Sequence, residues 1–405
     1  MPEPKLPTNV DTTLLTIDAG TSILKFAMFT ADGSLRQICT GFVEGIGTTQ
    51  SRIHATDTNG KALFDEGRRI ASYSDALKLI LDLIETHVLG SRLRAIGHRV
   101  AHGGSRFVKS VILSERVESE LKKLVHLSPL RQPNNIGAVV AARAIFTNIV
   151  HVACFDSAFH QRRPEIATFT GLRGETNDAG LRRFGTHGLA FEHAIDTLHR
   201  RGTPVSREKI IMVHLDDNAS ICALKYGTSV EVATDFSPLA GLRFGIFCGA
   251  LDRATIVSLL SRKEIDAGQT QQLISEADKV PERINLAFET NKLLSRFKDP
   301  LVLKAVEMFC YQVRKQLVGL TAALGGLDRL VFTGRVGVNA PLVRAKICAG
   351  LEYLDIAIDT VRNTNGAQTI SSPVRAVTIE TVATDEAVTV ARHVRHILRE
   401  KSNLV

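Results

Sequence analysis

The chain has no tryptophan, and only 5% of its 405 residues are aromatic. Proteins that bind single-stranded nucleic acid stack the bases on aromatic side chains within a basic groove. Here the lysines and arginines are spread along the whole chain, without a basic tail. We therefore expect no nucleic-acid partner. The net charge of +8 is instead compatible with anionic small molecules as ligands.

Long apolar runs are also missing. No stretch approaches the roughly 20 apolar residues that a membrane-spanning helix needs. The first residues lack the basic and apolar segments of a secretory leader. The six cysteines are scattered singly and form no CxxC pair or metal-ligand cluster. These absences predict a cytoplasmic protein with reduced thiols and no membrane partner.

What the chain does have is the length for two domains. Its 44% hydrophobic and 23% charged residues are typical of a globular protein. A strand, turn, strand pattern occurs twice, over residues 14–29 and again over residues 210–226. Two distant copies of one hairpin predict a duplicated α/β domain, with two unrelated hairpins as the alternative. Amphipathic segments at 74–88, 115–127, 301–324 and 385–399 predict helices between and after the strands.

Ionisable side chains follow two of the apolar runs. Ile96 leads into His98 and Arg99, and residues 149–152 lead into Asp156. Proteins with α/β sheets hold their ligands just past the ends of buried strands. An arginine there can bind a carboxylate or phosphate through two hydrogen bonds. The alternative is a structural ion pair.

Three other segments are typical of nucleotide contacts. The turn Asp18-Ala-Gly-Thr-Ser22 offers hydroxyls and backbone N–H groups to phosphate and a carboxylate to Mg²⁺, and residues 216–220 form a second such turn. Gly334 and Gly337 follow an apolar run, where glycines permit close approach of a ligand to the backbone. An ordinary hairpin and a plain strand-to-helix turn are the alternatives.

Four segments together resemble the acetate kinase (acetokinase) family. They are Gly97-His-Arg-Val-Ala-His-Gly-Gly104, Cys154-Phe-Asp-Ser-Ala-Phe-His-Gln-Arg-Arg-Pro164, Phe184-Gly-Thr-His-Gly188 and Thr384-Asp-Glu386, and the resemblance runs from about residue 14 to residue 394. It implies two duplicated actin-like ATPase (ribonuclease H-like) domains with an interdomain cleft, and a homodimer. The N-terminal domain would comprise residues 1–157 plus 384–405, and the C-terminal domain residues 158–383.

The resemblance also implies a reaction and its residues. The reaction would be reversible, Mg²⁺-dependent phosphoryl transfer between ATP and acetate or propionate. Catalytic residues would be Arg99, Asp156 and His187, with Arg131 beside them. Carboxylate-binding residues would be Arg99, Ala101, Leu130, Thr186 and Pro238, and Asp18 and Glu386 would hold the metal. Nucleotide-binding residues would be Thr21, Ser22, Lys25, His214, Asp217, Asn218, Gly334, Gly337 and Asn339.

The chain departs from the family pattern at several of these positions. Phe247 stands where the family has a second catalytic arginine, and Ala250 stands where an aspartate follows. In related phosphoryl-transfer systems such an arginine contributes about 10³–10⁵ in rate. Arg131 replaces a site histidine, which suggests a compensating cation. The small residues Ala101 and Thr186 predict room for propionate. The alternative function is a catalytically impaired protein that binds nucleotide or acyl phosphate in a regulatory role.

Overall fold

The computed structural model describes residues 12–20, 23–87, 92–169, 182–216, 219–233 and 300–402. The chain divides into two compact units, residues 1–159 with 385–405 and residues 160–384. Within the described ranges, none of the helices combines the length and apolar character needed to cross a bilayer. The described cysteines are buried and form no disulfide with one another; they are Cys39, Cys154, Cys222, Cys310 and Cys348.

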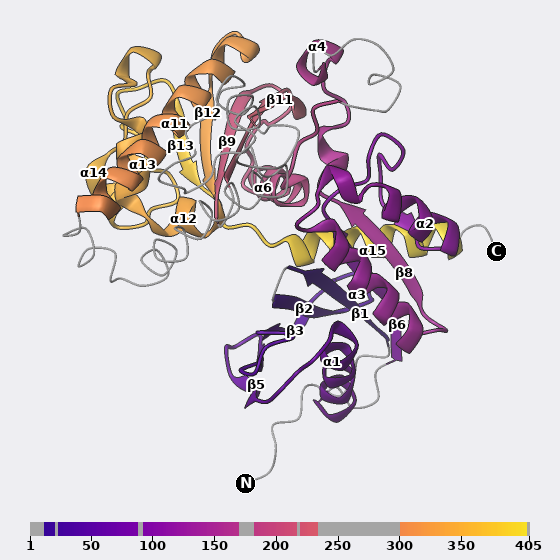
Figure 1. Ribbon diagram of the computed structural model, residues 1–405. Coiled ribbons are helices and arrows are strands. Elements are labelled where there is room, and N and C mark those ends of the chain that lie inside the picture. The colour runs from indigo at the N-terminus through magenta and orange to yellow at the C-terminus, as the bar shows by residue number, and fades with distance from the viewer. Residues whose placement is uncertain are drawn as a thin grey trace, which may run out of the picture. The chain divides into compact units, whose positions relative to one another are not determined.

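The first unit is built around an eight-stranded sheet with the order β5-β4-β3-β2-β1-β6-β8-β7. Its strands are β1 (Thr12–Ala19), β2 (Ile23–Thr30), β3 (Gln37–Glu44), β4 (Arg52–Asp57), β5 (Ala62–Gly67), β6 (Arg92–Val100), β7 (Val111–Ile112) and β8 (Val150–Phe155). Strands β1 to β5 pair antiparallel, whereas β6 is parallel to β1 and β8 is parallel to β6. The carboxyl ends of β1, β6 and β8 therefore lie at one edge of the sheet (Figure 1).

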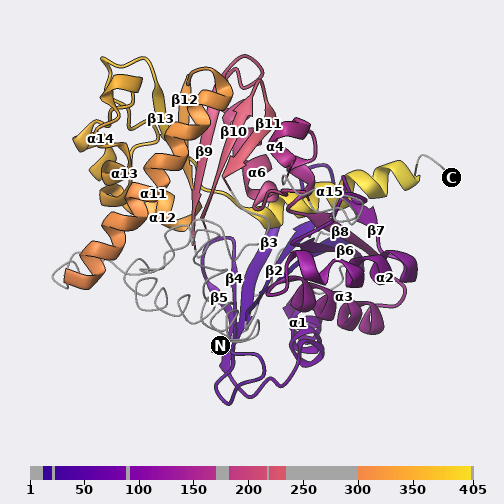
Figure 2. The ribbon, with the colours of Figure 1, turned by 45° about the horizontal axis from the view of Figure 1, so that its top comes forward.

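Helices cover both faces of this sheet. They are α1 (Tyr73–His87), α2 (Glu115–Lys123), α3 (Gln132–Ile145) and α15 (Glu386–Ser402). Because neighbouring residues of a strand point to opposite faces, Ile96 packs into a core with Ala138 of α3, while Gly97 faces α15. A Cβ at Gly97 would lie 2.5 Å from Val390, so glycine lets the last helix approach the sheet closely. Figure 2 shows α1 and α3 on one side and α15 on the other.

The second unit has a five-stranded sheet with the order β11-β10-β9-β12-β13. Its strands are β9 (Lys209–Leu215), β10 (Ala219–Lys225), β11 (Thr228–Ala233), β12 (Arg329–Thr333) and β13 (Thr378–Thr381). Its helices include α4 (Glu165–Thr168), α6 (Gly188–Arg200), α11 (Pro300–Leu324), α12 (Gly334–Asn339), α13 (Pro341–Cys348) and α14 (Thr360–Thr364). Helix α11 packs Val313 and Leu317 against Val213 of β9. The next residue, His214, faces α6 instead, with its ring 6.1 Å from that of Phe191.

The two units repeat one strand plan. In each, three antiparallel strands (β3-β2-β1 and β11-β10-β9) continue through two further strands that run parallel to the third (β6-β8 and β12-β13). The duplicated α/β fold of actin-like type, expected from the two hairpins and from the family resemblance, is confirmed. The hairpin of residues 14–29 forms β1 and β2, and that of residues 210–226 forms β9 and β10.

Candidate active site

Three charged side chains stand where the parallel strands of the first unit end. Asp18 is the last residue but one of β1, Arg99 is the last but one of β6, and Asp156 directly follows β8. Parallel strands present their carboxyl ends at the same edge of a sheet, which is where α/β proteins bind ligands. The sheet topology therefore brings together residues that are far apart in the sequence.

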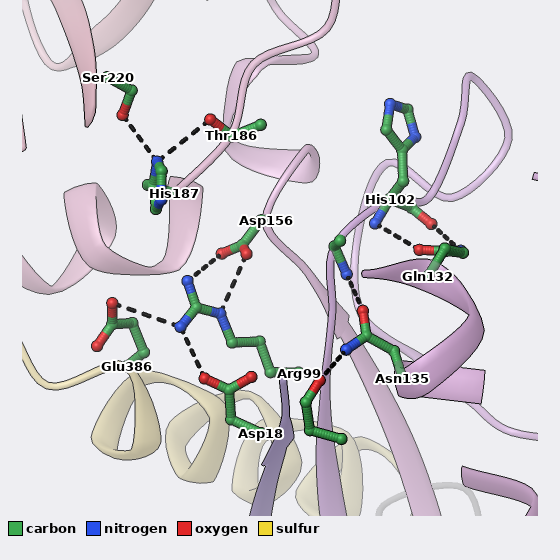
Figure 3. A network of polar contacts seen from close by, with 12 residues as sticks. Asp18, Arg99, His102, Gln132, Asn135, Asp156, Thr186, His187, Ser220 and Glu386 are labelled. Carbon is green, nitrogen blue, oxygen red and sulfur yellow. Dashed lines mark hydrogen bonds and ion pairs between the residues drawn. The ribbon is translucent and has the colours of Figure 1, made fainter. Parts of the chain in front are cut away.

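The guanidinium of Arg99 joins the carboxylates of Asp18 and Asp156 (Figure 3). Nε of Arg99 donates to Oδ2 of Asp156 at 3.0 Å, and Nη2 donates to Oδ1 of the same carboxylate at 3.3 Å. Nη1 donates to Oδ2 of Asp18 at 2.9 Å and lies 3.5 Å from Oε1 of Glu386. Three carboxylates thus surround one buried arginine, and the cluster carries an excess of negative charge.

The charges of the cluster support one another. Burial disfavours the charged form of Arg99, but its three carboxylate partners keep its pKa well above the ordinary value. Burial likewise opposes ionisation of Asp18. The positive charges of Arg99, Arg131 and Lys25 outweigh that effect and lower the pKa of this carboxyl. Lys25 is the direct partner of Asp18 in the β1–β2 ladder. Asp18 is therefore ionised at neutral pH.

Glu386 reaches the cluster from the opposite end of the chain because α15 begins there. The side chain of Asp385 accepts a hydrogen bond from the backbone N–H of Val388 at 3.2 Å and so caps the helix. The first turn of a helix favours carboxylates, because its unpaired N–H groups carry partial positive charge. Close packing of α15 on Gly97 then fixes the position of Glu386 beside Arg99.

The donor set of this cluster fits a magnesium ion shared with a ligand. Oδ1 of Asp18 is buried and has no hydrogen-bond partner among the described residues, so it is available to a cation. Among those residues, no group of three or more histidine, cysteine, aspartate or glutamate side chains is arranged to hold a metal ion. Mg²⁺ commonly binds through one or two carboxylates and completes its shell with water and substrate phosphates. Asp18 and Glu386 supply that number of carboxylates.

The start of α3 lies beside the ends of β1 and β6. Arg131 occupies the N-cap position and is half-buried, and its guanidinium makes no hydrogen bond or ion pair with the described residues. It is nevertheless close enough to Asp18 to lower the pKa of that carboxyl. Leu130 is partly exposed just before it, and Ala101 follows the end of β6. Arg131, which stands where the family has a histidine, therefore places near the cluster a cation without an ion-pair partner among the described residues.

In the second unit, His187 is held by a strained backbone and two hydroxyls. It has left-handed dihedral angles (φ 58°, ψ 24°) directly before α6, a region that most residues with side chains avoid. Its Nδ1 lies 2.9 Å from Oγ of Ser220 and 3.2 Å from Oγ1 of Thr186 (Figure 3). Its ring centroid is 4.7 Å from that of His214, whose Nδ1 lies 2.9 Å from Oγ1 of Thr333. Both predicted histidines therefore belong to one polar cluster.

A third buried histidine, His160, supports the segment before His187. Nε2 of His160 lies 3.0 Å from the carbonyl oxygen of Thr186, and Nδ1 lies 2.9 Å from Oγ of Ser229. Gly185 is required here because a Cβ would stand 2.3 Å from the His160 ring. Burial, with a further contribution from the nearby Arg163, lowers the pKa of His160 to about 3. His160 is therefore neutral at physiological pH.

This neutral histidine predicts acid sensitivity. Unfolded histidine has a pKa near 6.5, so below about pH 6.5 the unfolded chain binds a proton that folded His160 does not. Its contribution to stability is present above that pH and is lost as the pH falls towards 3. In His160→Gln, the fall in unfolding free energy between pH 7 and pH 5 should shrink by about 2 kcal/mol, measured by urea denaturation.

The matched control is His199→Gln, which alters an exposed histidine of α6 in the same unit. It should leave the pH dependence of stability unchanged. A His160→Gln protein with the pH dependence of the parent chain would contradict a neutral, buried His160.

The predicted nucleotide-contact glycines lie where β12 passes into α12. Gly334 has φ 77°, and a Cβ there would lie 2.4 Å from the carbonyl oxygen of Leu215. Glycine is therefore needed both for the turn and for its contact with β9. Gly337 is buried within α12, and Asn339 ends this helix with an exposed side chain. The two glycines thus belong to a tight turn from β12 into a short helix.

Several predicted positions lie outside the described residues. They are Thr21, Ser22, Asp217, Asn218 and Pro238, together with the departures at Phe247 and Ala250.

Other residues of the two clusters were missed by sequence reasoning. Asn135 binds the backbone beyond β6, Thr333 contacts His214, and His160 supports Thr186. Ser220 belongs to the segment of residues 216–220, which the sequence predicts to contact phosphate, so its hydroxyl could have been identified as a site group. An individual amide near the start of an otherwise apolar helix, such as Asn135, has no periodic signal of its own.

Comparison with known proteins gives one consistent result. The model of the acetokinase family matches residues 13–392. The chain is 35% identical over 396 residues to an acetate kinase of Rhodopseudomonas palustris (strain TIE-1), which covers 94% of this chain and 97% of the relative. It is 33% identical over 388 residues to an acetate kinase of Rhizobium meliloti, with 94% and 97% covered.

Solved structures of similar proteins cover nearly the whole chain. A propionate kinase from Francisella tularensis subsp. tularensis SCHU S4 matches with a TM-score of 0.84 and 26% identity, over 94% of this chain and 98% of that one. The acetate kinase of Porphyromonas gingivalis matches with a TM-score of 0.80 and 27% identity, over 96% and 100%.

Proposed function

The chain belongs to the acetokinase family, and from that premise we propose that it is a carboxylate kinase. It transfers a phosphoryl group reversibly between ATP and acetate or propionate, giving ADP and an acyl phosphate. The observation that carries this proposal is Arg99, buried among Asp18, Asp156 and Glu386 at the carboxyl edge of the first sheet. A fixed guanidinium at this edge is suited to bind the carboxylate or phosphoryl oxygens of a substrate.

Asp156 acts as a positioning residue in this proposal. A carboxylate substrate is already ionised at neutral pH, so no proton has to be removed before its oxygen attacks phosphorus. Asp156 instead binds Nε and Nη2 of Arg99 and orients the guanidinium plane. Arginine has five N–H donors, and the contacts with described residues leave an N–H of Nη2 for the substrate. As the new P–O bond forms, the bond from phosphorus to the leaving ADP oxygen breaks.

A magnesium ion would be held by Asp18 and Glu386. When bound, it neutralises charge on the phosphoryl oxygens. The support is the buried, unpartnered Oδ1 of Asp18 and the nearness of both carboxylates to Nη1 of Arg99. The carboxylates of Asp18 and Glu386 place oxygen ligands beside the strand ends. Arg99, which contacts both of them, limits their mutual repulsion.

His187 would donate a hydrogen bond to the transferring phosphoryl group. Its ring is oriented by Ser220 and Thr186 and lies beside the ring of His214. ATP would contact residues that follow β1 in the sequence, namely Thr21, Ser22 and Lys25, and residues of α12, namely Gly334, Gly337 and Asn339. His214, Asp217 and Asn218 complete the proposed nucleotide contacts. Electrostatic groups held in place before the reaction lower the barrier without a cost of reorganisation.

The test is formation of acyl phosphate, trapped as the hydroxamate, with ATP, Mg²⁺ and a panel of acids with two to four carbons. The Asp156→Ala variant is the control. Turnover with acetate or propionate that disappears in this variant supports the proposal. No turnover with any of these acids, while calorimetry still detects ATP binding, overturns it in favour of a binding protein with a regulatory role.

Arg131→Ala is expected to lower kcat about tenfold, which corresponds to about 1.4 kcal/mol of transition-state stabilisation. The reason is that Arg131 supplies a positive charge near Asp18, without an ion-pair partner among the described residues, as a substitute for the arginine missing at Phe247. Steady-state kinetics measures the effect. The control is Arg116→Ala, which removes an exposed arginine from α2 in the same unit. Unchanged kcat in Arg131→Ala would contradict the role.

Three finer features are part of the proposal. The residues that form the acyl site would be Arg99, Ala101, Leu130, Thr186 and Pro238. The small side chains of Ala101 and Thr186 would leave room for propionate and favour it over acetate. The proposed domains are residues 1–157 with 384–405, and residues 158–383. The protein would act in the cytoplasm, as its cysteine pattern suggests, and as a homodimer, as the family resemblance implies.

A further inference from the structure

A buried amide joins two strand ends at the site. Oδ1 of Asn135 accepts a hydrogen bond from the backbone N–H of Ala101 at 2.9 Å, and its Nδ2 donates to the carbonyl oxygen of Ala19 at 2.7 Å (Figure 3). The residue Asn135 is 3% exposed. Each amide atom thus has a backbone partner, one in the segment after β6 and the other at the end of β1.

The bridge stands where the strand ladder stops. The last paired residues of β1 and β6 are Ile17 and His98. Beyond them β1 continues to pair with β2, and β6 continues to pair with β8, through residues that include Asp18 and Arg99. The pairing of β1 with β6 therefore ends beside Asp18 and Arg99, and Ala19 and Ala101 lie beyond it. Asn135 joins the two chain segments at that point.

We propose that Asn135 is a positioning residue of the phosphoryl-transfer site, which sets the spacing of Asp18 and Arg99 by joining the strand ends that carry them. The inference rests on the proposed carboxylate kinase activity. Asn135 acts through the backbone: it binds the residue after Asp18 and the second residue after Arg99. The hydrogen bond from Arg99 Nη1 to Asp18, at 2.9 Å, is the contact that this spacing maintains.

The same helix provides a matched control in Gln132. This residue is also a buried amide with two backbone hydrogen bonds, from the N–H of His102 at 3.1 Å and to its carbonyl oxygen at 3.0 Å. Both bonds go to a single residue after β6, so Gln132 anchors that segment without joining it to β1. In both Asn135→Asp and Gln132→Glu, the amide NH2 group that donates to the backbone is lost and a buried carboxylate is added.

The experiment compares Asn135→Asp with Gln132→Glu in the full chain, by thermal unfolding and by steady-state kinetics with ATP and the acid that the parent chain uses best. Comparable losses of thermal stability are expected. Asn135→Asp should lower kcat about tenfold with little change in KM for ATP, because small displacements of catalytic groups are costly. Gln132→Glu should keep kcat within about twofold of the parent chain.

Equal losses of kcat in the two variants, with the parent chain active, would overturn the positioning role and leave the proposed function intact. An inactive parent chain would overturn both. If Asn135→Asp does not fold, Asn135→Ser is compared with Gln132→Ser under the same criterion, because serine retains a small polar group without adding charge.

Discussion

Replacing Arg99 with alanine is expected to lower kcat/KM for the kinase reaction by about 10³-fold or more. It should also lower the free energy of unfolding by about 3–5 kcal/mol, the usual cost of removing one partner from a buried ion pair. The loss would leave Asp156 buried and without its partner, and Asp18 and Glu386 without the cation that they share. Hydroxamate trapping measures the activity, and urea denaturation measures the stability.

A second buried arginine separates the two effects. Arg329 at the start of β12 donates to both oxygens of Glu208, at 2.7 and 3.0 Å, and lies 3.2 Å from Glu380. Its exposure, 8%, equals that of Arg99. Arg329→Ala should therefore destabilise the protein to a similar degree, while the folded fraction retains the kcat of the parent chain. If Arg99→Ala also retained the kcat of the parent chain, Arg99 would be only a structural ion-pair partner.

Asp156→Asn is expected to lower kcat about 10²–10³-fold, because an amide accepts hydrogen bonds from Arg99 through only one of its two terminal atoms. The loss of stability should be smaller, about 1–3 kcal/mol. Asp18 and Glu386 remain beside Arg99, and the excess negative charge of the cluster falls. Steady-state kinetics and urea denaturation of the same preparation test the two parts.

Glu208→Gln is the control for this substitution, because it alters a carboxylate bound in the same forked manner to Arg329. It should change stability to a similar extent and leave kcat unchanged. If Asp156→Asn lost stability but kept its kcat, the orienting role of Asp156 would be wrong.

Much of the fold was predictable because its signals are local. The apolar runs at residues 14–17 and 210–215 end in polar turns, and they form β1 and β9 of the two repeated sheets. The amphipathic segment at 74–88 forms α1, and the segment at 115–127 shortens to α2 (Glu115–Lys123) followed by a single 3₁₀ turn. Helix ends depend on capping: Ser114 accepts a hydrogen bond from the N–H of Val117 at the start of α2.

The site was predictable to the extent that strand ends identify it. Arg99 and Asp156 follow apolar runs, and parallel neighbours place such residues at one edge. The motif residues of the second unit, His187 and His214, could be named, but nothing in the pattern indicated that their rings are 4.7 Å apart. Their contact arises because β9 passes beside the start of α6, and that packing involves segments distant in the sequence.

The sequence by itself determined the strands, the duplicated hairpins and the positions of the charged residues, because alternation, turns and caps act over a few neighbouring residues. Only the tertiary structure decided that Arg99 meets three carboxylates and that Asn135 joins β1 to β6. A pattern of burial specifies which face of an element is covered but not which partner covers it. That choice depends on close packing, as at Gly97, where the missing side chain lets α15 bring Glu386 to the site.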